Sequence, residues 1–231
     1  MLFVEPIEGF AKQGRRVVAL PGAFRSRFDL MHHASSVAAI LQESEQPVRE
    51  ILLTEFRFGT GDRGSWHVLA EQVAEVLRPG DVLFADSLGG ALAALFPEEV
   101  RGGIRVLLRR PPLVGLLRMV PEGPVQKIYA SWLRRIAGCE YDRVVQSILP
   151  EIPDYPGGFG VAPEPAVLSQ IISDFGASNV ELLGSSPKNW FILKGGQDQS
   201  FHPTGALGSW QNWGMKVFDN LPSAVSALQL D

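Results

Sequence analysis

The chain has 231 residues, 45% of them hydrophobic and 20% charged, as expected for a globular protein of one domain or of one domain with an insertion. Its net charge of −4 argues against a nucleic-acid-binding protein. A single cysteine, Cys139, excludes an internal disulfide and fits a reducing compartment. Residues 1–10 carry acidic side chains where an export signal needs basic ones, and no apolar run reaches the roughly 18 residues of a membrane span. We therefore expect a cytoplasmic protein with no membrane span.

Apolar segments and turn residues alternate along most of the chain. Runs of β-type residues predict strands at 2–4, 16–20, 50–56, 82–85, 103–108, 190–193 and 215–218. Helical spacing predicts helices at 30–41, 65–76, 203–213 and 224–230. One more helix is predicted in the Ala- and Leu-rich run that follows a turn at 86–90 and ends before Pro97. The expected buried stripes are Leu30, Ala34, Val37 and Leu41 in the first helix, and Trp66, Leu69, Val73 and Val76 in the second.

This alternation is typical of βαβ units. We predict an α/β fold with a mainly parallel central sheet flanked by helices. Right-handed crossovers bring the loops that follow parallel strands to one edge of the sheet. The turn at Pro21–Gly22 and the turn at Ser87 are therefore expected at the same, carboxyl-terminal edge.

The alternation stops between residues 113 and 187. This block holds two amphipathic segments, around 125–136 and 166–175, with a Pro- and Gly-rich stretch at 155–165 between them. We predict a mostly helical cap over 113–187, inserted into an α/β core formed by residues 1–112 and 188–231.

Ser87 stands where the strand-like run at 82–85 meets an Ala- and Leu-rich helical run. A serine at a strand–turn–helix junction projects its hydroxyl out of the sheet, and the residues two before and two after it must be small because strand and helix backbones nearly touch. Ala85 and Gly89 meet this requirement. The stretch A-D-S-L-G at 85–89 resembles the G-x-S-x-G nucleophile elbow of the α/β-hydrolase superfamily, with alanine for the first glycine. The alternative is that Ser87 only caps a helix.

The order of elements resembles the α/β-hydrolase core with a cap insertion over nearly the whole chain. The resemblance implies that Ser87 is the nucleophile and that the backbone amides of Leu88 and Ala23 form an oxyanion hole. The segment 195–198 is similar to the G-x-x-D segment that carries the acid of the triad, which implies that role for Asp198. The alternative is that Asp198 is a turn aspartate beside two glycines.

The position of the histidine departs from the family pattern. In the family this residue follows the last strand, but no histidine follows residue 202 here. His202 lies four residues after Asp198, and we weigh it as the base from a shifted position against a cap of the helix near Pro203. His32, His33 and His67 lie on predicted helices and are interpreted as surface or packing histidines.

Asp86, which precedes Ser87, is unusual beside an oxyanion site. A carboxylate there opposes the negative charge that develops in the reaction unless it is paired or turned away. Arg25, Arg109 and Arg110 are the candidate partners. The alternative is that Asp86 accepts hydrogen bonds from the amides of the turn.

The resemblance implies a serine hydrolase that cleaves a carboxylic ester or thioester of a small or apolar acyl group. The expected substrate pocket is lined by Phe24, Leu116, Met119, Trp132 and Phe159. The alternative function is that of a catalytically inactive α/β-hydrolase-fold protein that serves as a binding or scaffold module, which the missing C-terminal histidine favours.

No cofactor is expected. No His, Cys and Asp cluster has the spacing of metal ligands, and no glycine-rich dinucleotide loop or Walker lysine is present. The expected partner is a small-molecule acyl substrate, either free or attached to a carrier, and no nucleic acid.

Overall fold

The structure is a computed structural model that describes residues 2–7, 11–22, 30–56, 66–86, 88–93, 95–109, 189–193 and 215–228. Its strands are β1 Leu2–Ile7, β2 Arg15–Leu20, β3 Val48–Phe56, β4 Val82–Asp86, β5 Arg105–Arg109, β6 Trp190–Leu193 and β7 Lys216–Phe218. Its helices are α1 Met31–Glu43, α2 Trp66–Val76, α3 Leu88–Ala93, α4 Glu98–Gly103 and α10 Leu221–Ala227. Among these helices none has the length and apolarity that crossing a membrane requires.

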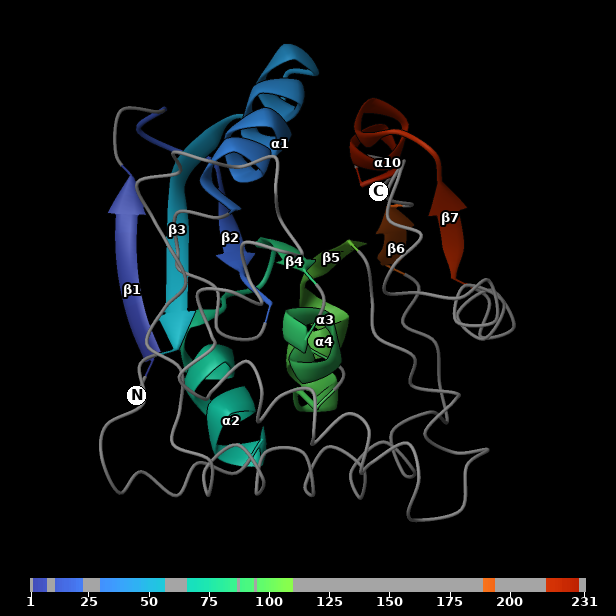
Figure 1. The fold of residues 1–231 in the computed structure, drawn as a ribbon. Helices are drawn as coiled ribbons and strands as arrows, with labels where there is room; N and C mark the ends of the chain where they lie inside the picture. The colour runs from blue at the N-terminus through green and yellow to red at the C-terminus, as the bar shows by residue number, and fades with distance from the viewer. Residues whose placement is uncertain are drawn as a thin grey trace, which may run out of the picture.

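The seven described strands form one sheet in the order β1-β3-β2-β4-β5-β6-β7 (Figure 1). Every neighbouring pair is parallel except β1 and β3, which are antiparallel. The predicted α/β fold with a mainly parallel sheet is therefore confirmed. β4 lies in the middle of the sheet, between β2 and β5, and each of its residues is buried.

Residues that alternate along the central strands face two different layers of helices. Val17 and Phe84 belong to a buried cluster with α1 and α10 on one face of the sheet. Val18 and Leu83 belong to a second cluster with α2, α3 and α4 on the other face (Figure 1). Both faces are thus covered, which explains why the parallel strands are continuously apolar rather than alternating.

The two buried helical stripes predicted from the sequence are confirmed at every position whose side chain the structure describes, which leaves Trp66 untested. Leu30, Ala34, Val37 and Leu41 are all buried against the sheet. In α2, Leu69 and Val73 are buried and Val76 is partly buried in the opposite cluster.

Three predictions of local structure need correction, two of them around α4 and one at the last helix. The helix α4 at Glu98–Gly103 was not predicted, and the strand expected from residue 103 begins at Arg105. Two glycines at the end of α4 made a helix look unfavourable, but Glu98 and Glu99 in its first turn suit the positive end of the helix dipole.

The last helix begins before its predicted start at residue 224. Asn220 is the N-cap, and its side-chain oxygen accepts a hydrogen bond from the Ser223 amide at 2.9 Å. Pro222 suits the first turn because that turn leaves amides without helical partners. The predicted helix at 203–213 and the predicted cap at 113–187 lie outside the described residues.

A buried ion pair joins the amino ends of β2 and β4. Arg16 donates to both carboxylate oxygens of Asp81, from Nε at 3.0 Å and from Nη2 at 2.5 Å, and both side chains are almost inaccessible to solvent. Arg16 Nη2 also donates to the Val76 carbonyl at 2.8 Å, and Asp81 accepts from the Arg78 amide at 2.8 Å. These hydrogen bonds offset the desolvation of the two charges and tie the end of α2 to the central strands.

Replacement of Asp81 by alanine is expected to lower the free energy of unfolding by about 3–5 kcal/mol, because it leaves the buried Arg16 guanidinium without its counter-charge. Urea denaturation measures this change. The double variant Arg16→Met/Asp81→Leu should lose much less, since neither charge remains. Glu75→Ala, on the exposed side of α2, is the control and should change stability by less than about 0.5 kcal/mol. An Asp81→Ala effect as small as that of the control would contradict this account.

Candidate functional site

The candidate site lies at the carboxyl-terminal end of β4. This strand ends at Asp86 and α3 begins at Leu88, so a single residue, Ser87, separates strand from helix. Ser87 itself lies outside the described residues. A serine at a nucleophile elbow is expected to have φ > 0, and for Ser87 this stays a prediction. The order of strand, turn and helix is the predicted one, but the helix begins at Leu88 and includes Gly89 and Gly90, which were predicted to lie in the turn.

The first turn of α3 touches the end of β2. A Cβ atom at Gly89 would lie 2.6 Å from the Leu20 carbonyl oxygen and 2.8 Å from the Pro21 carbonyl oxygen. Ala85 is fully buried and pairs with Leu20 in the parallel register of β2 and β4. The requirement for small residues around position 87 is therefore confirmed at Gly89, and the Pro21 turn lies at the same edge as the β4–α3 junction.

Asp86 is buried and paired. Its Oδ1 lies 3.4 Å from Nε of Arg109, and only 2% of the residue is exposed. The two residues face one another in the register of β4 and β5, at the last position of each strand. Of the three arginines considered as partners, the structure identifies Arg109, while Arg25 and Arg110 lie outside the described residues. The Asp86 carboxylate is thus compensated by a positive charge.

Arg109 also reaches His33 in the first turn of α1. Its Nη1 lies 2.5 Å from Nε2 of His33, and because a guanidinium only donates, this ring nitrogen accepts. The His33 ring is stacked on Phe84, with centroids 5.9 Å apart and an interplanar angle of 10°. The contact with Phe84 confirms the interpretation of His33 as a packing histidine. The contact with Arg109 was missed.

A signal for this second contact was present in the sequence. The helix α1 follows β2, so its first turn begins at the carboxyl-terminal edge of a parallel sheet, where functional loops gather. His32 is exposed and its ring meets that of His33 edge to face. Asp86, Arg109 and His33 therefore form a linked polar cluster, contributed by β4, β5 and α1, next to position 87.

The structure does not describe most of the other predicted site residues. Those outside the described residues are Ser87, Ala23, Phe24, Leu116, Met119, Trp132, Phe159, Asp198 and His202. Leu88 is described as the first residue of α3. The roles assigned to all of them stay predictions. Within the ranges that the structure describes, no three His, Cys, Asp or Glu side chains are grouped so that they could hold a metal ion.

Comparison with solved structures identifies the architecture. A hydrolase from Pseudomonas aeruginosa superposes with a TM-score of 0.66 at 11% identity, over 100% of this chain and 94% of that one. A thermophilic esterase from Thermogutta terrifontis superposes with a TM-score of 0.59 at 15% identity, over 94% of this chain and 84% of that one. The peroxisomal α/β-hydrolase Lpx1 of Saccharomyces cerevisiae superposes with a TM-score of 0.55 at 14% identity, over 90% of this chain and 71% of that one. The protein has the α/β-hydrolase fold.

Comparison of the sequence alone finds no match, either to a model of a known protein family or to a curated protein. In this α/β-hydrolase fold the β4–α3 junction follows the carboxyl end of the central strand. The cluster of Asp86, Arg109 and His33 lies beside this junction. The strand order thus brings the polar residues of two strands and one helix to the edge where the sequence places Ser87.

Gly89→Ala is expected to lower the free energy of unfolding by roughly 1–3 kcal/mol, because the added Cβ meets two backbone oxygens that cannot move aside independently. Thermal or urea unfolding measures the loss. Gly102→Ala is a matched control, since Gly102 also lies in a helix but an added Cβ there meets no atom within 4 Å. That variant should be neutral or more stable, by up to about 1 kcal/mol. Equal effects of the two substitutions would argue against a close approach at Gly89.

Proposed function

We propose that the protein is a serine hydrolase that cleaves carboxylic esters or thioesters of small or apolar acyl groups, with Ser87 as the nucleophile. The observation that carries this proposal is the β4–α3 junction, where one residue separates the central strand from a helix that touches the end of β2 through Gly89. A backbone this crowded is what a nucleophile elbow requires. The structural likeness to an esterase adds support from the fold.

The proposed reaction follows from the roles of five residues. Ser87 Oγ attacks the acyl carbonyl carbon while His202 accepts the hydroxyl proton and Asp198 orients the imidazole. The carbonyl oxygen becomes an oxyanion that accepts hydrogen bonds from the amides of Leu88 and Ala23. Collapse of this adduct breaks the ester or thioester bond, and His202 returns the proton to the leaving oxygen or sulfur. Water then cleaves the acyl-serine by the same steps.

The electrostatics of the described cluster support this proposal. The developing oxyanion would lie close to Asp86, whose negative charge would oppose it. Arg109 compensates that charge from the neighbouring strand. We propose that Arg109 is a positioning residue: it neutralises Asp86 and holds it on the side of the sheet that faces α1.

The proposal extends to the cap and the cell compartment. Residues 113–187 would cover the active site, and Leu116, Met119, Trp132 and Phe159, together with Phe24, would line an apolar acyl pocket. The single Cys139 supports a cytoplasmic location.

Ser87→Ala is expected to abolish both the hydrolysis of short acyl nitrophenyl esters and labelling by a fluorophosphonate, because the variant lacks the attacking oxygen. Ser44→Ala, at an exposed serine after α1, is the control and should react like the wild type. A wild-type protein that is neither labelled nor active with several acyl lengths would favour the binding or scaffold function instead.

His202→Ala is expected to lower kcat by a factor on the order of 10³ or more, as for the loss of a base that works within a triad. His33→Gln, which removes the imidazole beside Arg109, is the comparison. Steady-state kinetics of both variants identify the base. An intact rate in His202→Ala with a large loss in His33→Gln would assign the base to His33.

Arg109→Gln is expected to lower kcat by a factor on the order of 10, since it removes a positive charge that offsets the charge of Asp86 near the oxyanion. The double variant Asp86→Asn/Arg109→Gln should recover most of the rate, because it removes both charges. Arg109→Lys, which keeps the positive charge, should lose less than Arg109→Gln. A double variant as slow as Arg109→Gln alone would show that Arg109 acts in another way.

A further inference from the structure

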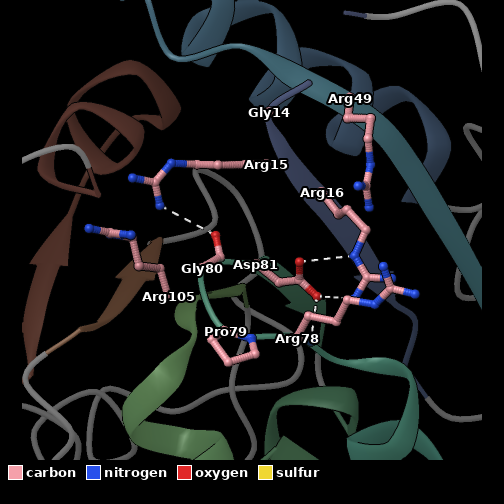
Figure 2. Close-up of a pocket in the computed structure, with 9 residues that line it drawn as sticks. All are labelled: Gly14, Arg15, Arg16, Arg49, Arg78, Pro79, Gly80, Asp81 and Arg105. Carbon is pink, nitrogen blue, oxygen red and sulfur yellow. Dashed lines mark hydrogen bonds and ion pairs between the residues drawn. The ribbon is translucent and has the colours of Figure 1, made fainter. Parts of the chain in front are cut away.

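A pocket rich in arginine lies at the amino-terminal edge of the sheet, at the opposite end of the central strands from the candidate active site. Its volume is about 470 Å³ (Figure 2). Its lining includes Asp81 and five arginines, which are Arg15, Arg16, Arg49, Arg78 and Arg105. The arginines come from the starts of β2, β3 and β5 and from the segment after α2, so the fold gathers them from distant parts of the sequence.

Three of these arginines already have partners. Arg16 forms the buried ion pair with Asp81 described above, in which both carboxylate oxygens accept hydrogen bonds. Arg49 Nη2 lies 2.9 Å from Oε1 of Glu50. Arg105 also interacts with other groups, so its charge is not counted as available. The positive charge that a ligand can use is therefore that of the two remaining arginines.

Arg15 and Arg78 provide this charge. Arg15 Nη1 donates to the Gly80 carbonyl oxygen at 3.3 Å, and because this acceptor is neutral, the guanidinium keeps its positive charge. The backbone amide of Arg78 donates to Asp81 at 2.8 Å. The residue is exposed to solvent, and its guanidinium forms no ion pair within the ranges that the structure describes. Both guanidinium groups can therefore pair with an anion from outside.

A single turn holds both of these arginines in place. The Asp81 amide donates to the Arg78 carbonyl at 3.1 Å, and Gly80 has a φ of +86°, as in a type II turn with Pro79 and Gly80 at its centre. The Gly80 amide donates to the Gly103 carbonyl at 2.8 Å, which ties the turn to the end of α4. The space beside Gly80 is open, since a Cβ there would meet no atom within 4 Å. The backbone of the pocket is thus fixed before a ligand arrives, which lowers the entropy cost of binding.

The two available charges lie apart from one another. Figure 2 shows Arg15 on one side of the turn and Arg78 on the other. Each guanidinium fork matches one carboxylate in a bidentate pair. In an extended peptide, alternate side chains lie on the same side of the chain, about 7 Å apart, so its carboxylates can reach two separate arginines. We propose that this pocket docks an extended acidic segment of a partner protein, with its carboxylates paired to Arg15 and Arg78.

The charge of the whole chain favours an acidic protein segment over nucleic acid. The net charge is −4, so the positive charge of this edge is local and an acidic partner is repelled from most other surfaces. Nucleic acids need a larger set of cations along the phosphate backbone than the two arginines offer.

This site is separate from the proposed active site. It lies at the amino ends of the strands, and Ser87 follows the carboxyl end of β4, a strand length of roughly 17 Å away. The docking site therefore does not depend on the proposed hydrolase function.

The test is the binding of a fluorescent peptide of alternating glutamate and threonine to the full chain, followed by fluorescence anisotropy. The peptide should bind saturably, and its Kd should rise with ionic strength. The same peptide with glutamine in place of glutamate is the neutral control and should not bind. No saturable binding of the acidic peptide at low ionic strength would overturn the proposal. Tighter binding of pyrophosphate or of single-stranded DNA than of the peptide would also overturn it, in favour of a compact anion or of nucleic acid.

The decisive variant is Arg15→Gln/Arg78→Gln, which should raise the Kd of the acidic peptide at least about tenfold, because two charge-assisted pairs are lost. Lys216→Gln removes an exposed positive charge that does not line the pocket and should bind as the wild type does. Wild-type affinity in the double variant would overturn the proposal. Arg78→Gln alone changes an exposed side chain and tests the site if the double variant does not fold. Its Kd should also rise, and an unchanged Kd would exclude Arg78 from the site.

Ser87→Ala distinguishes this proposal from the proposed function. It should bind the acidic peptide with unchanged affinity, whatever its effect on ester hydrolysis. A loss of peptide binding in Ser87→Ala would place the peptide in the active site and overturn a separate docking pocket.

Discussion

The pairing of β2 with β4 is the constraint on which the rest of the structure depends. At their amino ends the strands are joined by the buried pair of Arg16 and Asp81. At their carboxyl ends they are held by the close approach of Gly89 to the carbonyl oxygens of Leu20 and Pro21. Both contacts tolerate little change, since one needs a complete set of hydrogen bonds and the other a residue without a side chain. The register of these two central strands therefore determines where the helices lie on both faces of the sheet. It also determines which residues meet at the amino and carboxyl ends of the strands.

The two edges of this sheet carry different chemistry. At the carboxyl edge, Asp86, Arg109 and His33 form a polar cluster beside the proposed nucleophile. At the amino edge, arginines from β2, β3 and β5 surround an open pocket. The parallel strands β2 to β7 allow this separation because they all begin at one edge of the sheet and end at the other.

Most of the described fold could be predicted because its signals are local. The stripe from Leu30 to Leu41 has the spacing of one helix face, and all four of its residues are buried. The apolar run at 82–85 becomes the central strand. The helix α4 was missed because its glycines disfavour a helix, whereas its acidic first turn and its packing on the sheet favour one. The ends of helices and strands are harder to predict from local signals than the elements themselves. The start of α10 after the Asn220 cap, earlier than predicted, is an example.

The sequence by itself determined the α/β fold class, the strand–turn–helix order around Ser87 and the need for small residues at Ala85 and Gly89. These follow from side-chain periodicity and from backbone crowding within a few residues. Only the tertiary structure decided that Arg109 is the partner of Asp86, that His33 reaches Arg109, and that the arginines which begin β2 and β5 share a pocket. The reason is that the lateral order of strands is not written in the spacing of residues along the chain. It depends on how the whole sheet is covered by helices, and neighbours in the sheet come from distant parts of the sequence.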